Sequence, residues 1–210
     1  MRRHICLTVL FILFIAACSS SPTADDEPPV QQTSLPPGDE GPPALVVDRS
    51  QWSERRLELE ERLVDYVAGA PSLNNALHQE PEALDEALEI RVDQQFQFEA
   101  EFANFTEANY GDADIEGWAS LRLGQMHLEM VCALRAMEAP EEATDEQVRQ
   151  FRQAIAMQTT PLLVNVHDHF RHALTNGSEP WDEGARELIE LLRQFDDEPR
   201  QACEEAERYW

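Results

Sequence analysis

The chain has 210 residues, enough for one ordinary domain with a core, and carries 41 acidic against 16 basic residues, a formal charge of −25. An electrostatic field of that sign repels phosphate backbones, so the composition argues against a nucleic-acid partner. Every basic residue is an arginine. A cationic partner is compatible with the charge, although acidic helix faces are most often simply solvated surface.

The first 17 residues have the layout of an export signal. Arg2 and Arg3 precede the apolar run ICLTVLFILFI, and two small residues, Ala16 and Ala17, stand before Cys18. The apolar run is shorter than the roughly 20 residues that span a bilayer. We therefore expect residues 1–17 to be removed, which leaves 14 basic against 41 acidic residues and a charge of −27.

The sequence Ile-Ala-Ala-Cys at residues 15–18 resembles the lipobox of bacterial lipoproteins. In that family the cysteine thiol receives a diacylglyceryl group, the signal is cut just before the cysteine, and the new amino group is acylated. The resemblance implies these modifications for Cys18, and several acyl chains on one residue give stable attachment to a lipid bilayer. Ser19 stands where many inner-membrane lipoproteins have Asp, so the expected location is the outer membrane, facing the periplasm. An ordinary secretory peptide cleaved after Ala17 and an uncleaved anchor remain as alternatives.

Residues 18–48 are expected to form a disordered tether behind the acylated cysteine. The segment is rich in proline, has no apolar period and contains few large side chains to bury. A coil of this size reaches on the order of 30 Å, so the folded part can stand off the membrane surface. The folded domain is expected over residues 49–210.

Past residue 49 the pattern is helical almost throughout. Apolar residues recur at helical spacing, and no stretch alternates with a period of two over a useful length. Thr144 to Gln147 form a capping box, and Pro161 predicts either a kink or two helices sharing an axis. The expected fold is all-α, built of antiparallel helix pairs. The expected helices are 50–69, 81–109, 115–137, 144–176, 181–195 and 199–210.

Residues 110–195 resemble the terminal helical module of tetratricopeptide-type exported proteins and lipoproteins of myxobacteria and their relatives. Leu123 and Gly124 occupy the place of the Leu-Gly pair that lets the next helix pack closely, and Ala136 that of the small interface residue. His127 departs from the pattern, because an aromatic residue is usual there, and no repeat period precedes this stretch. The resemblance implies a tetratricopeptide-like bundle or short solenoid that binds peptides or proteins and performs no catalysis.

The cysteines divide by compartment. Cys6 leaves with the signal and Cys18 takes the lipid, so Cys132 and Cys203 remain as a pair in an oxidising environment. We expect a disulfide between them. Both stand beside apolar residues, so two separate buried thiols remain the alternative.

The stretch HDHFRH is the most suggestive chemical feature of the domain. Asp168, His169 and His172 have helical spacings of three and four, and such residues could hold zinc, nickel or copper with help from another helix. The apolar face of this helix, however, places His169 near the core edge and turns His167 and His172 toward solvent. A histidine-rich helix surface with one packed imidazole is therefore the favoured interpretation.

The sequence favours binding over catalysis. It contains no nucleophile elbow, phosphate-binding glycine loop, dinucleotide fingerprint or zinc-peptidase motif, and we expect no enzymatic activity and no cofactor. The leading hypothesis is a membrane-anchored, non-catalytic scaffold that holds another protein at the cell envelope. The alternative is a lipoprotein that binds a metal or small ligand through the HDHFRH helix, and a folded spacer without a specific ligand is a third possibility.

Overall fold

The computed structural model describes residue 45 and residues 47–79, 81–195 and 199–209. The expected export signal, Cys18 and most of the expected tether lie outside these residues. The described part of the chain consists of helices and turns without a β-strand, which confirms the predicted all-α fold.

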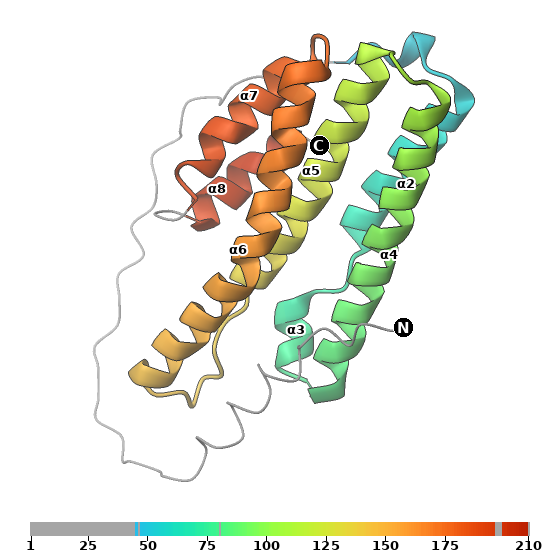
Figure 1. The fold of residues 1–210 in the computed structure, drawn as a ribbon. Coiled ribbons are helices and arrows are strands. Elements are labelled where there is room, and N and C mark those ends of the chain that lie inside the picture. Colours follow the sequence, from blue (N-terminus) through green and yellow to red (C-terminus); the bar gives the residue numbers. More distant parts are fainter. Residues whose placement is uncertain (1–44, 46, 80, 196–198, 210) are drawn as a thin grey trace, which may run out of the picture.

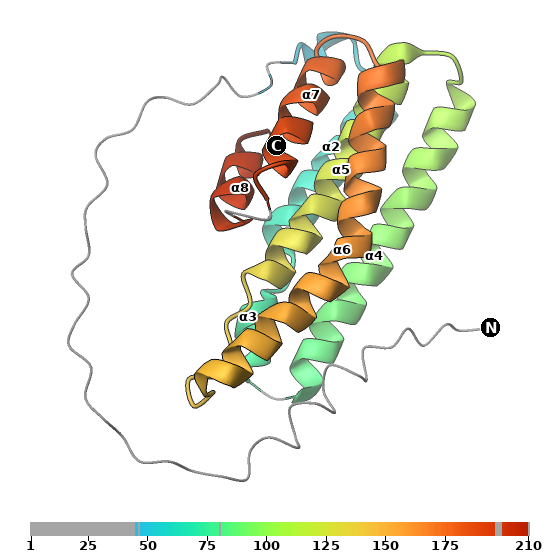
Figure 2. The same cartoon turned by 60° about the vertical axis from the view of Figure 1, so that its left-hand side comes forward.

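The bundle is arranged around one central helix, α5. The elements in chain order are η1 (Arg49–Gln51), α2 (Glu54–Gly69), α3 (Leu73–Leu77), α4 (Pro81–Ala108), α5 (Ala113–Arg135), α6 (Asp145–Asn176), α7 (Trp181–Leu192), α8 (Pro199–Ala206) and η2 (Glu207–Tyr209). Helix α5 contacts α2, α3, α4, α6, α7 and α8. Helices α4 and α6 both run antiparallel to α5, with α7 and α8 on the far side of α6 from α4 (Figures 1 and 2).

Local capping explains where the long helices begin. The Thr144 hydroxyl accepts from the Gln147 backbone N–H, and the Thr144 N–H donates to the Gln147 side chain at 2.8 Å, which is the predicted capping box at the start of α6. The Asp112 side chain caps α5 by accepting from the Asp114 and Ile115 N–H groups, and the Ser53 hydroxyl caps α2 by accepting from Arg56 N–H. Gly111, with a φ of 87°, makes the turn that reverses the chain between α4 and α5.

The N-terminal part of the domain differs from the prediction in three ways. The single expected helix over 50–69 is divided into η1 and α2. A short helix that the sequence analysis did not predict, α3, follows Pro71, and the Ser72 hydroxyl caps it by accepting from Asn75 N–H. Packing against the core also begins before residue 49, since Leu45 and Val47 are partly buried against it.

Helix α6 continues through Pro161 as one helix, so of the two alternatives predicted there, a kink or two helices sharing an axis, the second is not found. Proline removes the donor that the Met157 carbonyl would otherwise accept. Met157 is 68% exposed, so water can replace that donor. Packing of α6 against both α5 and α7 holds the helix on either side of the proline.

The core consists of a large cluster and a smaller one. The large cluster contains the buried aromatic residues Phe98, Phe102, Trp118, Phe170, Trp181 and Phe195. The smaller cluster lies where α3, α4, α5 and the N-terminal half of α6 meet, and contains Leu73, Leu84, Leu88, Met130, Met137, Phe151 and Ile155.

A buried ion pair connects α2, α5 and the C-terminal end of the chain. Glu60 is 1% exposed and Arg122 is 2% exposed. The Glu60 carboxylate accepts from Arg122 Nε at 3.0 Å and from Trp118 Nε1 at 2.9 Å. Arg122 Nη1 also donates to the Tyr209 carbonyl at 3.0 Å. Burial of these charges is tolerated because each has several hydrogen-bond partners.

A second buried arginine, Arg56, lies among three tryptophans. Its guanidinium carbon is 4.0 Å from the ring centroid of Trp52, 4.8 Å from that of Trp118 and 5.5 Å from that of Trp181. Asp114 pairs with Arg56 and accepts from Trp181 Nε1 at 2.6 Å. This cluster ties the turn before α2 to the starts of α5 and α7.

The close approach of α5 and α6 at Gly124 leads to a stability prediction. A Cβ atom added there would lie 2.4 Å from Phe170 Cε1 and 3.2 Å from His169 Cβ, so the helices would have to separate. We expect Gly124→Ala to lower the free energy of unfolding by about 1–3 kcal/mol in urea titrations.

The matched control is Gly69→Ala, because a Cβ atom at the end of α2 would meet nothing within 4 Å. The control should keep or slightly raise the stability of the protein. Equal loss in both variants would contradict the close packing at Gly124.

Candidate binding groove

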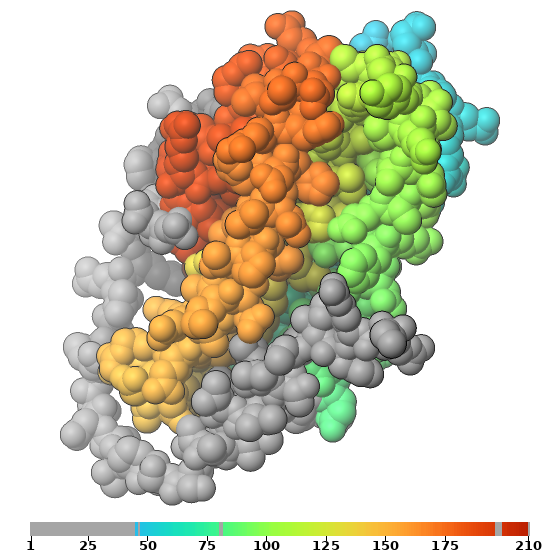
Figure 3. Space-filling view, in the orientation of Figure 1, coloured from blue at the N-terminus to red at the C-terminus, as the bar shows by residue number. Residues whose placement is uncertain are grey.

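A groove of about 970 Å³ opens between the C-terminal end of α5, the N-terminal half of α6, and α8. In the space-filling view the N-terminal end of α6 projects beyond α7 and α8 (Figure 3). The groove has an apolar lining that comes from four helices. Its members include Val67, Leu128, Met137, Val148, Ile155 and Ala206. Its volume is at the upper end of the range for pockets that hold small molecules or a few side chains.

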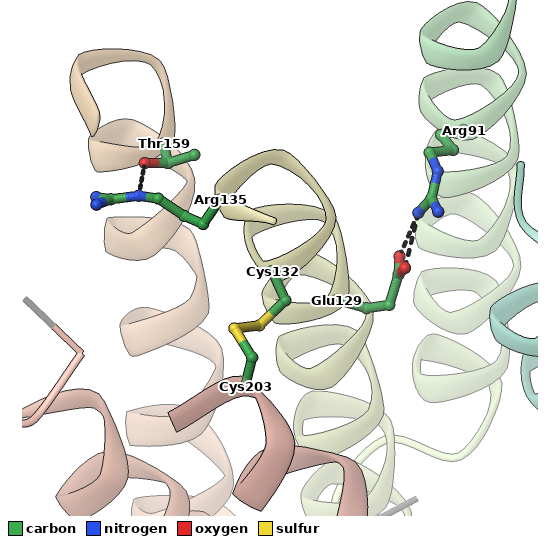
Figure 4. Close-up of a disulfide and its surroundings, with 6 residues drawn as sticks. All are labelled: Arg91, Glu129, Cys132, Arg135, Thr159 and Cys203. Atoms are coloured by element: carbon green, nitrogen blue, oxygen red, sulfur yellow. Dashed lines mark hydrogen bonds and ion pairs between the residues drawn. A yellow bond between two sulfur atoms is a disulfide. The ribbon is translucent and has the colours of Figure 1, made fainter. Parts of the chain in front are cut away.

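The predicted disulfide forms one wall of the groove. Cys132 on α5 and Cys203 on α8 are bonded, with their Cα atoms 5.7 Å apart, which confirms the expected pair (Figure 4). The bond closes a loop with a sequence separation of 71 residues. By the entropy of loop closure it contributes up to about 4 kcal/mol and keeps α8 attached to α5.

Three arginines line the groove: Arg135, Arg152 and Arg200. Arg135 Nε donates to the Thr159 hydroxyl at 2.7 Å, and that hydroxyl donates to the Ile155 carbonyl at 2.9 Å, which fixes the guanidinium between α5 and α6 (Figure 4). Arg200 lies 4.0 Å from Glu138. Within the described residues, neither Arg135 nor Arg152 has an acidic partner.

Acidic groups complete the rim. Glu129 accepts from Arg91 Nη1 at 2.7 Å on both carboxylate oxygens. Burial raises the pKa of Glu129, and the adjacent Arg91 opposes that shift. Glu129 and Arg91 therefore form a paired polar group beside the apolar lining of the groove.

The structure does not bring together the residues that the sequence suggested as metal ligands. His169 stacks on His127 with ring centroids 5.3 Å apart, whereas His172 contacts the Asn176 amide at 3.0 Å and Asp168 is exposed. Among the described residues, no group of three or more His, Cys, Asp or Glu side chains is arranged to hold a metal ion. His169 is the partly buried imidazole that the sequence analysis placed near the core edge.

His127 and Glu99 belong to a polar cluster that the sequence analysis missed. His127 Nε2 donates to Glu99 Oε1 at 3.1 Å, and this bond lowers the pKa of the Glu99 carboxyl. The two residues lie on α5 and α4, and His169 joins them from α6. No local sequence signal marks a contact among three separate helices.

Burial lowers the pKa of His169 to about 4, and the neighbouring His127 acts in the same direction. His172 also lowers it, while Glu99 and Asp168 oppose the shift. Because His169 then binds more protons in the unfolded chain than in the folded one between about pH 6.5 and pH 4, the stability that it contributes falls as the pH falls through this window.

We therefore expect the wild-type protein to lose about 1–2 kcal/mol of unfolding free energy through His169 between pH 7 and pH 5. His169→Gln should remove this share of the pH dependence in urea titrations at the two pH values. His172→Gln, which changes an exposed ring, should retain it. An unchanged slope in His169→Gln would contradict the prediction.

The two small residues named by the tetratricopeptide resemblance are Gly124, which lies at a helix–helix interface, and Ala136, which lies at the groove. Gly124 packs against Phe170 of α6, and Ala136 lines the groove. The tetratricopeptide relationship itself stays a prediction.

The fold and the groove place this chain among all-α helical bundles with a disulfide and a surface groove. No family model, curated protein or solved structure matches the chain. None of the helices in the described ranges is long and apolar enough to cross a membrane.

Proposed function

We propose that this protein is a lipid-anchored, non-catalytic scaffold of the bacterial cell envelope that holds a segment of another envelope protein in its groove. The observation that carries the proposal is the groove itself, with an apolar lining, a charged rim and a covalent bond that keeps its α8 wall in place. Such a combination of apolar centre and polar rim is typical of protein-binding surfaces.

The proposed anchor is Cys18, acylated after removal of residues 1–17. Support comes from the lipobox at residues 15–18 and from the proline-rich segment that separates Cys18 from the helices. The disulfide fits an oxidising compartment, and the outer membrane facing the periplasm is the proposed location. Of the two binding modes considered from sequence, the metal-binding one lacks a converging ligand set in the described part of the chain.

The anchor can be tested by intact mass spectrometry of the full-length protein produced in a bacterium with two membranes. We expect a mature chain that begins at acylated Cys18 and enters the detergent phase on phase separation. Reduction should add the mass of two hydrogens as the Cys132–Cys203 bond opens. Cys18→Ser should abolish acylation. A different first residue, or release from membranes without detergent, would refute the anchor.

The scaffold role can be tested by blocking the groove. Ala136 is exposed and lines the groove, so Ala136→Trp should fill part of it without disturbing the core. Ala100→Trp, at an exposed position on α4, is the matched control. In crosslinked envelopes we expect a stoichiometric partner with the wild type and with Ala100→Trp, and at least tenfold less with Ala136→Trp.

Two results would count against the scaffold. One is the absence of any stoichiometric partner with the wild type under several crosslinking chemistries. The other is equal recovery with both tryptophan variants, which would place the partner elsewhere on the molecule.

A further inference from the structure

We propose that the segment held by the groove presents a carboxylate beside apolar side chains, and that Arg135 and Arg152 receive this carboxylate. The inference rests on the proposed scaffold function and adds the chemistry of the partner. It uses two arginines on different helices, α5 and α6, that line the same hollow.

Arg135 and Arg152 differ from most arginines of the described ranges because neither forms an ion pair with an acidic side chain there. Of the 14 arginines in the described ranges, ten have an acidic group within 4.0 Å. The four without such a partner in those ranges are Arg135, Arg152, Arg171 and Arg208. Across the described ranges an arginine without an acidic partner is therefore the exception, and two of the four line the groove.

Arg135 is held ready for a carboxylate. Its Nε donates to the hydroxyl of Thr159, which is 0% exposed, and its guanidinium carbon lies 5.8 Å from the ring centroid of Phe195, so both contacts restrict the guanidinium. Neither Nη atom of Arg135 has a hydrogen-bond partner in the described residues, and two Nη groups match the two oxygens of a carboxylate. Preorganisation of this kind reduces the entropy lost on binding.

The surrounding charges favour a protein segment over a free anion. A chain with a formal charge of −25 repels small anions and so lowers their concentration near the groove. The rim residues Glu138, Glu204 and Glu207 would in addition attract basic side chains next to the bound carboxylate. The segment that fits is therefore apolar, carries one carboxylate, and has lysine or arginine on its flanks.

The experiment begins with the full-length protein in detergent micelles and a phage library of random 12-residue peptides. Selected peptides should be enriched in Asp, Glu or a free C-terminus beside apolar residues. The tightest peptide and its carboxylate-to-amide version are then synthesised with a fluorescent label. We expect the amide version to bind at least tenfold more weakly in anisotropy titrations.

Variants locate the carboxylate. Arg135→Gln and Arg152→Gln should each weaken the acidic peptide at least tenfold and leave the amide version little changed. Arg152 is exposed, so its substitution keeps the test valid even if Arg135→Gln disturbs packing with Thr159. Arg171→Gln, also exposed and on α6 but outside the groove lining, is the control and should bind as the wild type does.

The possible failures are distinguishable. If Ala136→Trp weakens peptide binding but Arg135→Gln and Arg152→Gln do not, the carboxylate inference is overturned and the scaffold function still stands. A library that yields no groove-dependent peptide would overturn both. Tight binding of the probe dodecanoate without peptide binding would also overturn both, in favour of a lipid-binding pocket.

Discussion

The buried Glu60–Arg122 pair is the constraint on which the arrangement of the bundle depends. Its hydrogen bonds run from α2 to Trp118 of α5 and to the carbonyl of Tyr209 at the C-terminal end. Apolar packing alone would allow helices to slide or rotate at little cost, since many apolar arrangements fill a core comparably well. A charge pair inside the core disfavours such shifts, because separation of Glu60 from Arg122 would leave a buried charge without its partner.

The arginine among the tryptophans extends this constraint to the neighbouring turn of α2 and to the start of α7. Arg56 lies one helical turn before Glu60 on α2, and its cluster includes Trp118, which also donates to Glu60. Trp118 therefore links Arg56 to the Glu60–Arg122 pair, and Asp114 joins α5 to both α2 and α7. A continuous polar and aromatic network thus connects α2, α5, α7 and the C-terminal end of the described chain.

Sequence reasoning predicted the parts that are coded locally. Periodicity and the Thr144 capping box placed the long helices, and the count of cysteines after the expected removal of the signal predicted the Cys132–Cys203 bond. It missed α3, and at Pro161 it left open whether α6 would continue or divide into two helices. It also missed Glu60 and Arg122, because acids and arginines at helical positions in so charged a chain read as solvated surface. Which of them are buried depends on contacts more than 60 residues apart, such as that from Arg122 to Glu60.

The groove follows from the unequal lengths of the helices. Helix α6 has 32 residues and is about 48 Å long, whereas α5 has 23 residues and is about 35 Å long. The N-terminal end of α6 therefore extends beyond the cover given by α7 and α8, and only the smaller core cluster supports it. The disulfide sets how far α8 can approach this overhang, so the groove is a fixed feature of the fold. Arg135 joins the last turn of α5 to α6 through its hydrogen bond to Thr159, so a ligand bound by Arg135 would be held by a residue that connects two walls of the groove.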